Sequence, residues 1–212
     1  MKTIALSMLI TEAANYHEPR NSIALDYIDF FEELGYLVIL VPNNSKCIDQ
    51  LFEKIHIDGI VLSGGNNVDP SLFNDSSKLV EVYPVRDKTE YQLINIGINK
   101  KIPILGICRG FHMINVFFGG SISMNINGHV EPKHVNVNHK IKYLDKEVIV
   151  NSYHNHGITD ANLSQDLEPL SYCGEIVEAF EAKKHRILAI QWHPERQTLD
   201  FDKQLVTDFL NS

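Results

Sequence analysis

The sequence predicts an α/β fold: a doubly wound, mostly parallel sheet with helices on both faces, in a single domain over residues 1–212. Three observations predict it. Apolar runs with strand character alternate with helical patterns through the first half of the chain, which is typical of βαβ units. Segments of strand character dominate later and add antiparallel strands. A chain of 212 residues with 44% hydrophobic content can bury one substantial core and need not be divided.

The N-terminal third contains a strand, a helix and a second strand. Residues 3–9 form an apolar run without a helical period, which indicates a strand. Residues 21–33 have the spacing of an amphipathic helix, with Asn21-Ser22 as its N-terminal signal and Gly35 as its stop. Residues 36–41 form a second apolar run, and a proline ends it.

The middle third repeats this alternation up to residue 118. Each apolar run is bounded by glycine, proline or polar residues, and helical patterns lie between the runs. The expected helices are 47–55, 86–100 and 109–118. The expected strands are 59–62 and 102–107.

The last third changes in character. Helical patterns thin out between residues 133 and 191, and we expect antiparallel strands there, notably at 147–150 and 176–180. The run at 187–190 is a further strand, and 202–210 is a closing helix. Because sites in parallel sheets lie at the C-terminal ends of the strands, the residues that directly follow each strand are the first candidates for function.

Cys108 is the candidate nucleophile because it stands between a strand and a helix. Gly106 and Gly110 flank it at two residues on either side, which is the thiol counterpart of the serine elbow Gly-x-Ser-x-Gly. Backbone on such a turn is strained and needs neighbours with almost no side chain. The helix N-terminus also favours thiolate over thiol. The alternative is a small, buried, apolar cysteine.

A base and its partner follow the run at 187–190, in Gln191-Trp192-His193-Pro194-Glu195. A strand that leads into this segment can deliver an imidazole to the end of a neighbouring strand. His193 is then the general base for Cys108, and Glu195 the carboxylate that orients it. An isolated motif of this kind would favour a surface turn, but its pairing with the cysteine elbow favours catalysis.

These motifs resemble those of the class I glutamine amidotransferase superfamily, and in particular its branch of free-standing γ-glutamyl hydrolases. The resemblance rests on 106–111, 115–121, 191–195, Leu62-Ser63-Gly64-Gly65-Asn66-Asn67-Val68-Asp69-Pro70, Arg86-Asp87-x-x-Glu90 and Asn151-Ser152-Tyr153-His154. It implies a flavodoxin-like sheet and hydrolysis of a γ-glutamyl amide through a thioester on the cysteine. It implies no cofactor.

The resemblance also implies further roles in the site. The backbone N–H groups of Gly65 and Arg109 would form the oxyanion hole. The residues implied to bind the substrate are Asn66, Arg86, Glu90, Asn151, Ser152 and His154. For the Arg86–Glu90 pair, the alternative is an exposed pair of charges on one helix face. Arg20, beside Asn21-Ser22 at the expected helix N-terminus, could hold a diphosphate, or it could be a solvated surface charge.

The sequence departs from these relatives at positions that bear on the leaving group of the substrate. His112-Met113 stands where they often carry Gln-Glu, Ile122-Ser123-Met124 where Leu-His-Gln is common, and the segment 128–139 is short. The whole chain also resembles hydrolases of γ-glutamyl-CDP-amidate in capsule phosphoramidate pathways, and this compound is the leading candidate substrate. The alternatives are a γ-glutamyl-γ-aminobutyrate hydrolase, a glutaminase subunit that passes ammonia to a separate synthase, and a relative that has lost catalysis.

The composition argues against some classes of partner and of cellular location. With 27 acidic and 19 basic side chains the net charge is −8, which argues against a nucleic-acid surface. No apolar run approaches a membrane span, and no signal peptide is evident. Three scattered cysteines argue against a disulfide framework and favour the cytoplasm. A homodimer is left open.

The ten histidines prompt a metal hypothesis, which the spacing disfavours. His129, His134 and His139 recur every five residues, and His154 and His156 add two more, but neither spacing matches a usual zinc pattern. Five-residue spacing also serves neither a strand face nor a helix face. We expect no metal.

Overall fold

The computed structural model describes residues 1–124, 126 and 135–212. The strands are β1 (Lys2–Ser7), β2 (Leu9–Glu12), β3 (Pro19–Ser22), β4 (Tyr36–Val41), β5 (Gly59–Leu62), β6 (Ile104–Ile107), β7 (Val135–Tyr143), β8 (Lys146–Tyr153), β9 (Ile158–Thr159), β10 (Leu167–Cys173), β11 (Ile176–Ala182) and β12 (Ile187–Ile190). The helices are α1 (Leu25–Glu33), α2 (Ile48–Lys54), α3 (Pro84–Lys100), α4 (Arg109–Phe117) and α5 (Asp200–Asn211), with a 3-10 turn at Pro70–Phe73. The part of the short segment 128–139 that runs from 128 to 134, with His129 and His134, lies outside the described residues.

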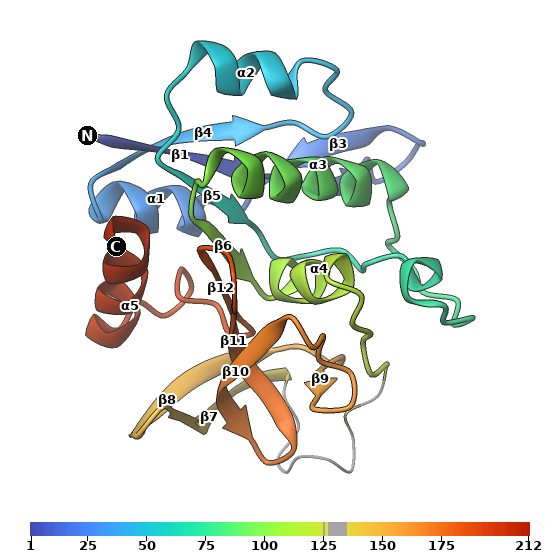
Figure 1. Ribbon diagram of the computed structural model, residues 1–212. Helices are drawn as coiled ribbons and strands as arrows, with labels where there is room; N and C mark the ends of the chain where they lie inside the picture. Colours follow the sequence, from blue (N-terminus) through green and yellow to red (C-terminus); the bar gives the residue numbers. More distant parts are fainter. Residues whose placement is uncertain (125, 127–134) are drawn as a thin grey trace.

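One large sheet organises the described chain, in the order β4-β1-β5-β6-β12-β11-β10-β7-β8, with β9 paired to β11 (Figure 1). From β4 to β12 neighbouring strands are parallel. From β12 to β8 they are antiparallel. This confirms the predicted fold class, a mostly parallel core followed by antiparallel strands.

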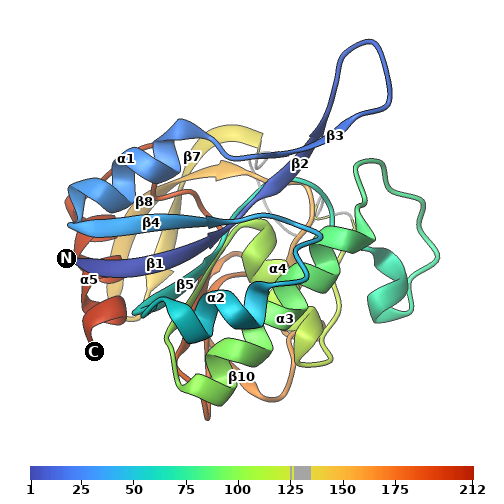
Figure 2. The ribbon, with the colours of Figure 1, turned by 90° about the horizontal axis from the view of Figure 1, so that it is seen from above.

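Helices cover both faces of the parallel half. On one face, Phe30 and Phe31 of α1 and Leu210 of α5 are buried in a single apolar cluster. On the other face, Phe52 of α2, with residues of α3 and α4, belongs to a second cluster (Figures 1 and 2). Strands buried on both faces read as continuous apolar runs, and this explains why β5, β6 and β12 could be predicted from the sequence.

The N-terminal region differs from the prediction. The expected helix over 21–33 begins only at Leu25, and the residues before it form a hairpin of β2 and β3 that projects past the end of β1 (Figure 2). Asn21 does not cap a helix; its side-chain oxygen accepts hydrogen bonds from the backbone N–H of Asn43, at 2.8 Å, and from the Asn43 amide, at 2.9 Å. The predicted helix start at Asn21-Ser22 is therefore wrong, because the Asn21 side chain bonds to a neighbouring segment and not to a helix N-terminus.

No helix in the described part of the chain is both long enough and apolar enough to cross a bilayer.

Candidate active site

The register of three parallel strands brings the candidate residues to one edge of the sheet. Leu62 of β5 pairs with Gly106 of β6, and Ile107 of β6 pairs with Ile190 of β12. The residues that directly follow these strands therefore converge. They border a hollow of about 580 Å³, which is lined by Gly65, Asn66, Asn67, Lys78, Leu79, Val80, Cys108, Arg109, His112, Tyr153, His154, Asn155, His156, His193 and Arg196.

Cys108 occupies the strained turn that the sequence predicts. Its φ of 53° and ψ of −98° lie where a side chain is rarely tolerated, at a cost of about 1–3 kcal/mol. A Cβ on Gly110 would lie 2.3 Å from the carbonyl oxygen of Leu62, and one on Gly106 would lie 2.8 Å from the backbone of Gly110. Both positions therefore require glycine. The Cys108 N–H donates to the Ile190 carbonyl at 2.9 Å, which fixes the turn to β12.

His193 and Glu195 lie beside Cys108 and are themselves buried. The Nδ1 atom of His193 is 2.6 Å from Oε1 of Glu195, which leaves the Nε2 side of the ring for the thiol. Burial alone would lower the pKa of His193, but the charges and hydrogen bonds of Cys108 and Glu195 raise it. Burial alone would raise the pKa of Cys108, but the charge and hydrogen bond of His193 lower it. These directions favour a thiolate–imidazolium pair.

The loop after β5 presents its backbone to the cysteine. A Cβ on Gly64 would lie 2.8 Å from Cε1 of His193 and 3.4 Å from Cβ of Cys108, so only glycine fits. The Gly64 N–H is taken by the Tyr27 hydroxyl at 2.8 Å. Gly65, at φ 77°, lines the hollow, and Arg109 opens α4, where a backbone N–H has no partner within the helix. This placement suits the predicted oxyanion donors.

Arg86 lies beneath this loop and not in the hollow, which corrects its predicted contact with substrate. Its side chain is fully buried, and its guanidinium donates to the carbonyl oxygens of Ser63, Gly64 and Gly65 at 2.7 to 2.9 Å. Because these carbonyls turn toward Arg86, the loop is held with its backbone in a fixed orientation. Burial and the charge of Arg109 lower the pKa of Arg86 to about 10, so it stays charged at neutral pH.

Glu90 is corrected in the same way. It is fully buried and pairs with Nε of Arg86 at 3.0 Å and with the Arg109 side chain. It also accepts the hydroxyl of Ser7 at 2.9 Å. A carboxylate with two guanidinium partners has no free face for a ligand ammonium. The prediction placed the pair on one helix face, which is right, but that face is turned into the protein.

Asn151 and Asn66, which are also predicted to contact substrate, bind the protein backbone through their side chains. Both polar atoms of the Asn151 side chain bond to the main chain of His193, at 2.7 and 2.9 Å. The Asn66 amide exchanges two hydrogen bonds with the backbone of Ile10, at 2.8 and 2.9 Å. Asn66 lines the hollow, while Asn151 and the fully buried Ser152 do not.

His154 does line the hollow. Its Nδ1 lies 2.9 Å from the carbonyl oxygen of His156, and its Nε2 lies 3.6 Å from the buried carboxylate of Glu178. His139 approaches the other oxygen of Glu178 at 3.5 Å. Burial opposes ionisation, but the Glu178 charge outweighs it and raises the pKa of His154. The imidazole of His154 thus borders the same hollow as Cys108. Among the described residues no three metal-ligating side chains are grouped to hold an ion.

Arg20 lies outside this hollow, on strand β3 of the hairpin. It is exposed, pairs with Glu18 at 2.6 Å and donates to the Tyr16 hydroxyl at 3.1 Å. Because no helix begins at Asn21, the predicted anion site of guanidinium and helix N-terminus does not form. Arg20 lines a separate shallow hollow with neighbouring asparagines.

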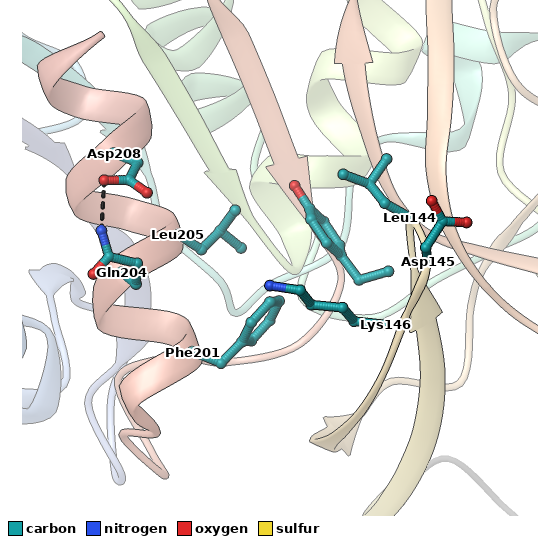
Figure 3. Close-up of a pocket in the computed structure, with 8 residues that line it drawn as sticks. Leu144, Asp145, Lys146, Phe201, Gln204, Leu205 and Asp208 are labelled. Carbon is teal, nitrogen blue, oxygen red and sulfur yellow. Dashed lines mark hydrogen bonds between the residues drawn. The ribbon is translucent and has the colours of Figure 1, made fainter.

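A further hollow of about 360 Å³ lies between the β7–β8 turn and α5. Figure 3 shows Phe201 and Leu205 extending from α5 toward Leu144, Asp145 and Lys146, while Gln204 and Asp208 lie along the helix and are hydrogen-bonded to each other. None of the predicted site residues lines it. The cysteine-containing hollow is therefore the candidate active site.

The sheet topology and the cysteine elbow together define the class I glutamine amidotransferase-like proteins. The sequence profile of Peptidase C26 matches residues 3–195, and the chain belongs to this family. The chain is thus a hydrolase, and the predicted family is confirmed.

Two relatives and one solved structure illustrate the similarity. A putative glutamine amidotransferase-like protein, YvdE, of Lactococcus lactis is 32% identical over 87% of this chain and 86% of its own. The γ-glutamyl-CDP-amidate hydrolase of Campylobacter jejuni is 34% identical over 86% of this chain and 84% of its own. A crystal structure of a putative GMP synthase subunit from Thermoplasma acidophilum aligns over 100% of this chain and 93% of its own, with a TM-score of 0.71 and 24% identity.

Several residues around the site escape the sequence-based prediction. Tyr27 occupies an apolar position of α1, yet its hydroxyl binds Gly64, and the charge of Glu195 adds to burial in raising the pKa of its phenol. Glu178 lies in a strand of apolar and acidic residues that gives no functional signal. Tyr153 and Arg196 also line the hollow, and their adjacency to His154 and Glu195 in the sequence is the one signal that could have found them.

Proposed function

We propose that this chain hydrolyses the amide bond of γ-glutamyl compounds through a thioester on Cys108 and releases L-glutamate. The observation that carries the proposal is the strained position of Cys108 beside His193, at the edge of the sheet and against a glycine loop. Strain of this kind persists where the surrounding structure enforces it, as at catalytic sites.

The first half of the reaction forms the thioester. The Cys108 thiolate attacks the γ-carbonyl carbon, and the oxygen becomes an oxyanion that accepts hydrogen bonds from the N–H groups of Gly65 and Arg109. Each such donor is worth about 3 kcal/mol in comparable sites. His193 then gives its proton to the nitrogen as the C–N bond breaks, and the amine leaves.

The second half releases glutamate. His193, now neutral, takes a proton from water, and the hydroxide attacks the thioester carbon. The C–S bond breaks, the Cys108 thiolate and the His193 imidazolium are restored, and glutamate leaves with a new γ-carboxyl group that loses its proton to solvent. Glu195 holds the Nδ1 proton of His193 through both halves.

We propose γ-glutamyl-CDP-amidate, in capsule phosphoramidate biosynthesis, as the substrate. The length and coverage of the match to the Campylobacter jejuni hydrolase support this choice. A reducing cytoplasm is the expected setting, since the nucleophile Cys108 must stay reduced.

The test is the release of glutamate by the pure chain from three substrates. We expect kcat/KM to be highest for γ-glutamyl-CDP-amidate, lower for γ-glutamyl-γ-aminobutyrate and lowest for glutamine. A preference for glutamine would instead favour a glutaminase subunit that supplies ammonia to a synthase. A Cys108→Ala variant is the control, and it should release no glutamate above background.

A further inference from the structure

The wall of the active-site hollow has an unusual charge balance. The chain as a whole carries 27 acidic and 19 basic side chains. Yet among the described residues that line the hollow none is Asp or Glu, whereas Lys78, Arg109 and Arg196 are cationic. The side chain of Arg109 is buried and paired with Asp87 and Glu90, which leaves Lys78 and Arg196 to face a ligand. The nearby carboxylates of Glu195 and Glu178 are fully buried behind His193 and His154, which they partner. Along the described part of the hollow, substrate thus meets positive charge and no exposed carboxylate.

Arg196 is held in place on this wall. The Cζ atom of its guanidinium lies 4.3 Å from the ring centroid of Tyr153, a cation–π contact. Its Nε atom lies 3.9 Å from Oε1 of Glu195, while 38% of the side chain stays exposed. A long side chain that is already ordered loses less entropy when it binds a ligand.

The same tyrosine connects Arg196 to the catalytic base. The ring of Tyr153 packs edge-on against His193, with 5.7 Å between ring centroids. In the proposed reaction the leaving nitrogen receives its proton from His193, so the leaving group must lie on the His193 side of the reacting carbon. Tyr153 contacts His193 and Arg196 contacts Tyr153, so a leaving group beside His193 comes within reach of this pair.

We infer that Arg196, seated on Tyr153, forms with Lys78 a leaving-group site that selects γ-glutamyl amides whose leaving group carries an anionic phosphate or carboxylate. This inference rests on the proposed function and adds to it the residues that set the substrate class. A guanidinium binds either anion through paired N–H donors, and Lys78 adds a second charge.

The experiment uses four γ-glutamyl amides of similar length, made from phosphoethanolamine, β-alanine, ethanolamine and ethylenediamine. Their leaving groups carry a phosphate, a carboxylate, no charge and a positive charge. Every substrate keeps the same glutamyl half, so any role of Arg196 in binding the α-carboxylate cancels when kcat/KM values are compared as ratios. We expect the wild-type chain to prefer the anionic substrates over the ethanolamine amide by about tenfold or more.

Variants then assign the preference to residues. In Arg196→Gln the ratio of kcat/KM for anionic over neutral substrate should fall about tenfold, and in Lys78→Gln it should fall less, because Lys78 is exposed and not held by a ring. Arg186→Gln is the matched control, since Arg186 is an exposed arginine that contacts the C-terminal Ser212, and its ratio should not change.

The outcomes separate the inference from the proposed function. Equal cleavage of all four amides, or an unchanged ratio in Arg196→Gln, would overturn the inference and leave γ-glutamyl hydrolysis standing. Cleavage of none of the four, under conditions where the chain is folded, would overturn both. Preference for the phosphate over the carboxylate would identify a phosphorylated leaving group, and the reverse an amino-acid leaving group; both support an anion site.

Discussion

Replacing Arg86 by methionine should lower both the stability of the fold and the rate of catalysis. Arg86 makes six hydrogen-bond contacts beneath the loop that carries Gly65, to three carbonyl oxygens, to the Asn66 and Ser63 side chains, and to Glu90. Methionine fills the same space but donates nothing, so the three carbonyls lose a buried partner. Tyr27 and Ile10 would still hold the N–H of Gly64 and the side chain of Asn66, but the three carbonyls of the loop would no longer be oriented.

The magnitudes follow from these contacts. Breaking a buried ion pair by removing one partner costs about 3–5 kcal/mol, and each kcal/mol shifts the melting temperature of a domain of this size by about 2–4 °C. We therefore expect Arg86→Met to lower Tm by about 10 °C. Loss of one oriented oxyanion donor lowers kcat by about 10² to 10³. Arg86→Lys keeps the charge but not the planar fork, so we expect a smaller loss, about tenfold, in kcat.

The assay combines thermal unfolding with steady-state kinetics on a γ-glutamyl amide. KM should change much less than kcat, because the loop acts on the oxyanion and not on the bound glutamyl group. Lys88→Met, an exposed position on the same helix, is the matched control and should change neither quantity. If Arg86→Met kept the wild-type kcat while its Tm fell, the loop would not depend on Arg86 and the positioning role would be refuted.

Three further substitutions test the geometry around the cysteine. Gly64→Ala would place a Cβ 2.8 Å from the ring of His193, and we expect kcat to fall about 10²-fold; a variant with normal kcat would mean that the ring can move without loss. Asn151→Ala removes two buried hydrogen bonds to the main chain of His193, so the free energy of unfolding should fall by about 2–3 kcal/mol. The fall in kcat should be larger than the rise in KM. A change in KM alone would restore the predicted role of Asn151 as a substrate contact. In His193→Asn, the pH midpoint for alkylation of Cys108 by iodoacetamide should rise relative to the wild-type chain, because burial then raises the pKa of the thiol without an opposing imidazolium. An unchanged midpoint would mean that His193 does not lower the pKa of Cys108.

The parallel half of the fold could be predicted because its signals are local. β5, β6 and β12 are apolar runs, and the glycines at 106 and 110 mark the elbow by themselves. The convergence of Cys108 and His193 followed from a rule about parallel strands, namely that their C-terminal ends share one edge of the sheet. The strand register supplies what the motifs alone do not. Because Ile107 pairs with Ile190, the segments that follow β6 and β12 start at the same level, and this brings Cys108 and His193 together.

The errors have a common physical origin. Arg86, Glu90 and Asn151 were assigned to substrate because they are polar and stand in recognisable segments, but the sequence does not tell whether a polar side chain serves a ligand or a buried backbone. In this fold the unpaired carbonyls of a tight loop and the main chain of His193 need partners, and these residues supply them. For Arg20 the diphosphate alternative is wrong, because Pro19–Ser22 is a strand and no helix begins there, and the surface-charge alternative is right, because Arg20 is exposed and paired with Glu18.

The central claim, that Cys108 is the nucleophile of a γ-glutamyl hydrolase, is tested most directly by mass spectrometry of the chain quenched in acid during turnover of a γ-glutamyl amide. We predict a mass increase of one glutamyl group on the peptide that contains Cys108, and its loss when hydroxylamine is added before digestion. Steady release of glutamate by Cys108→Ala, with no adduct on the wild-type peptide, would contradict this claim.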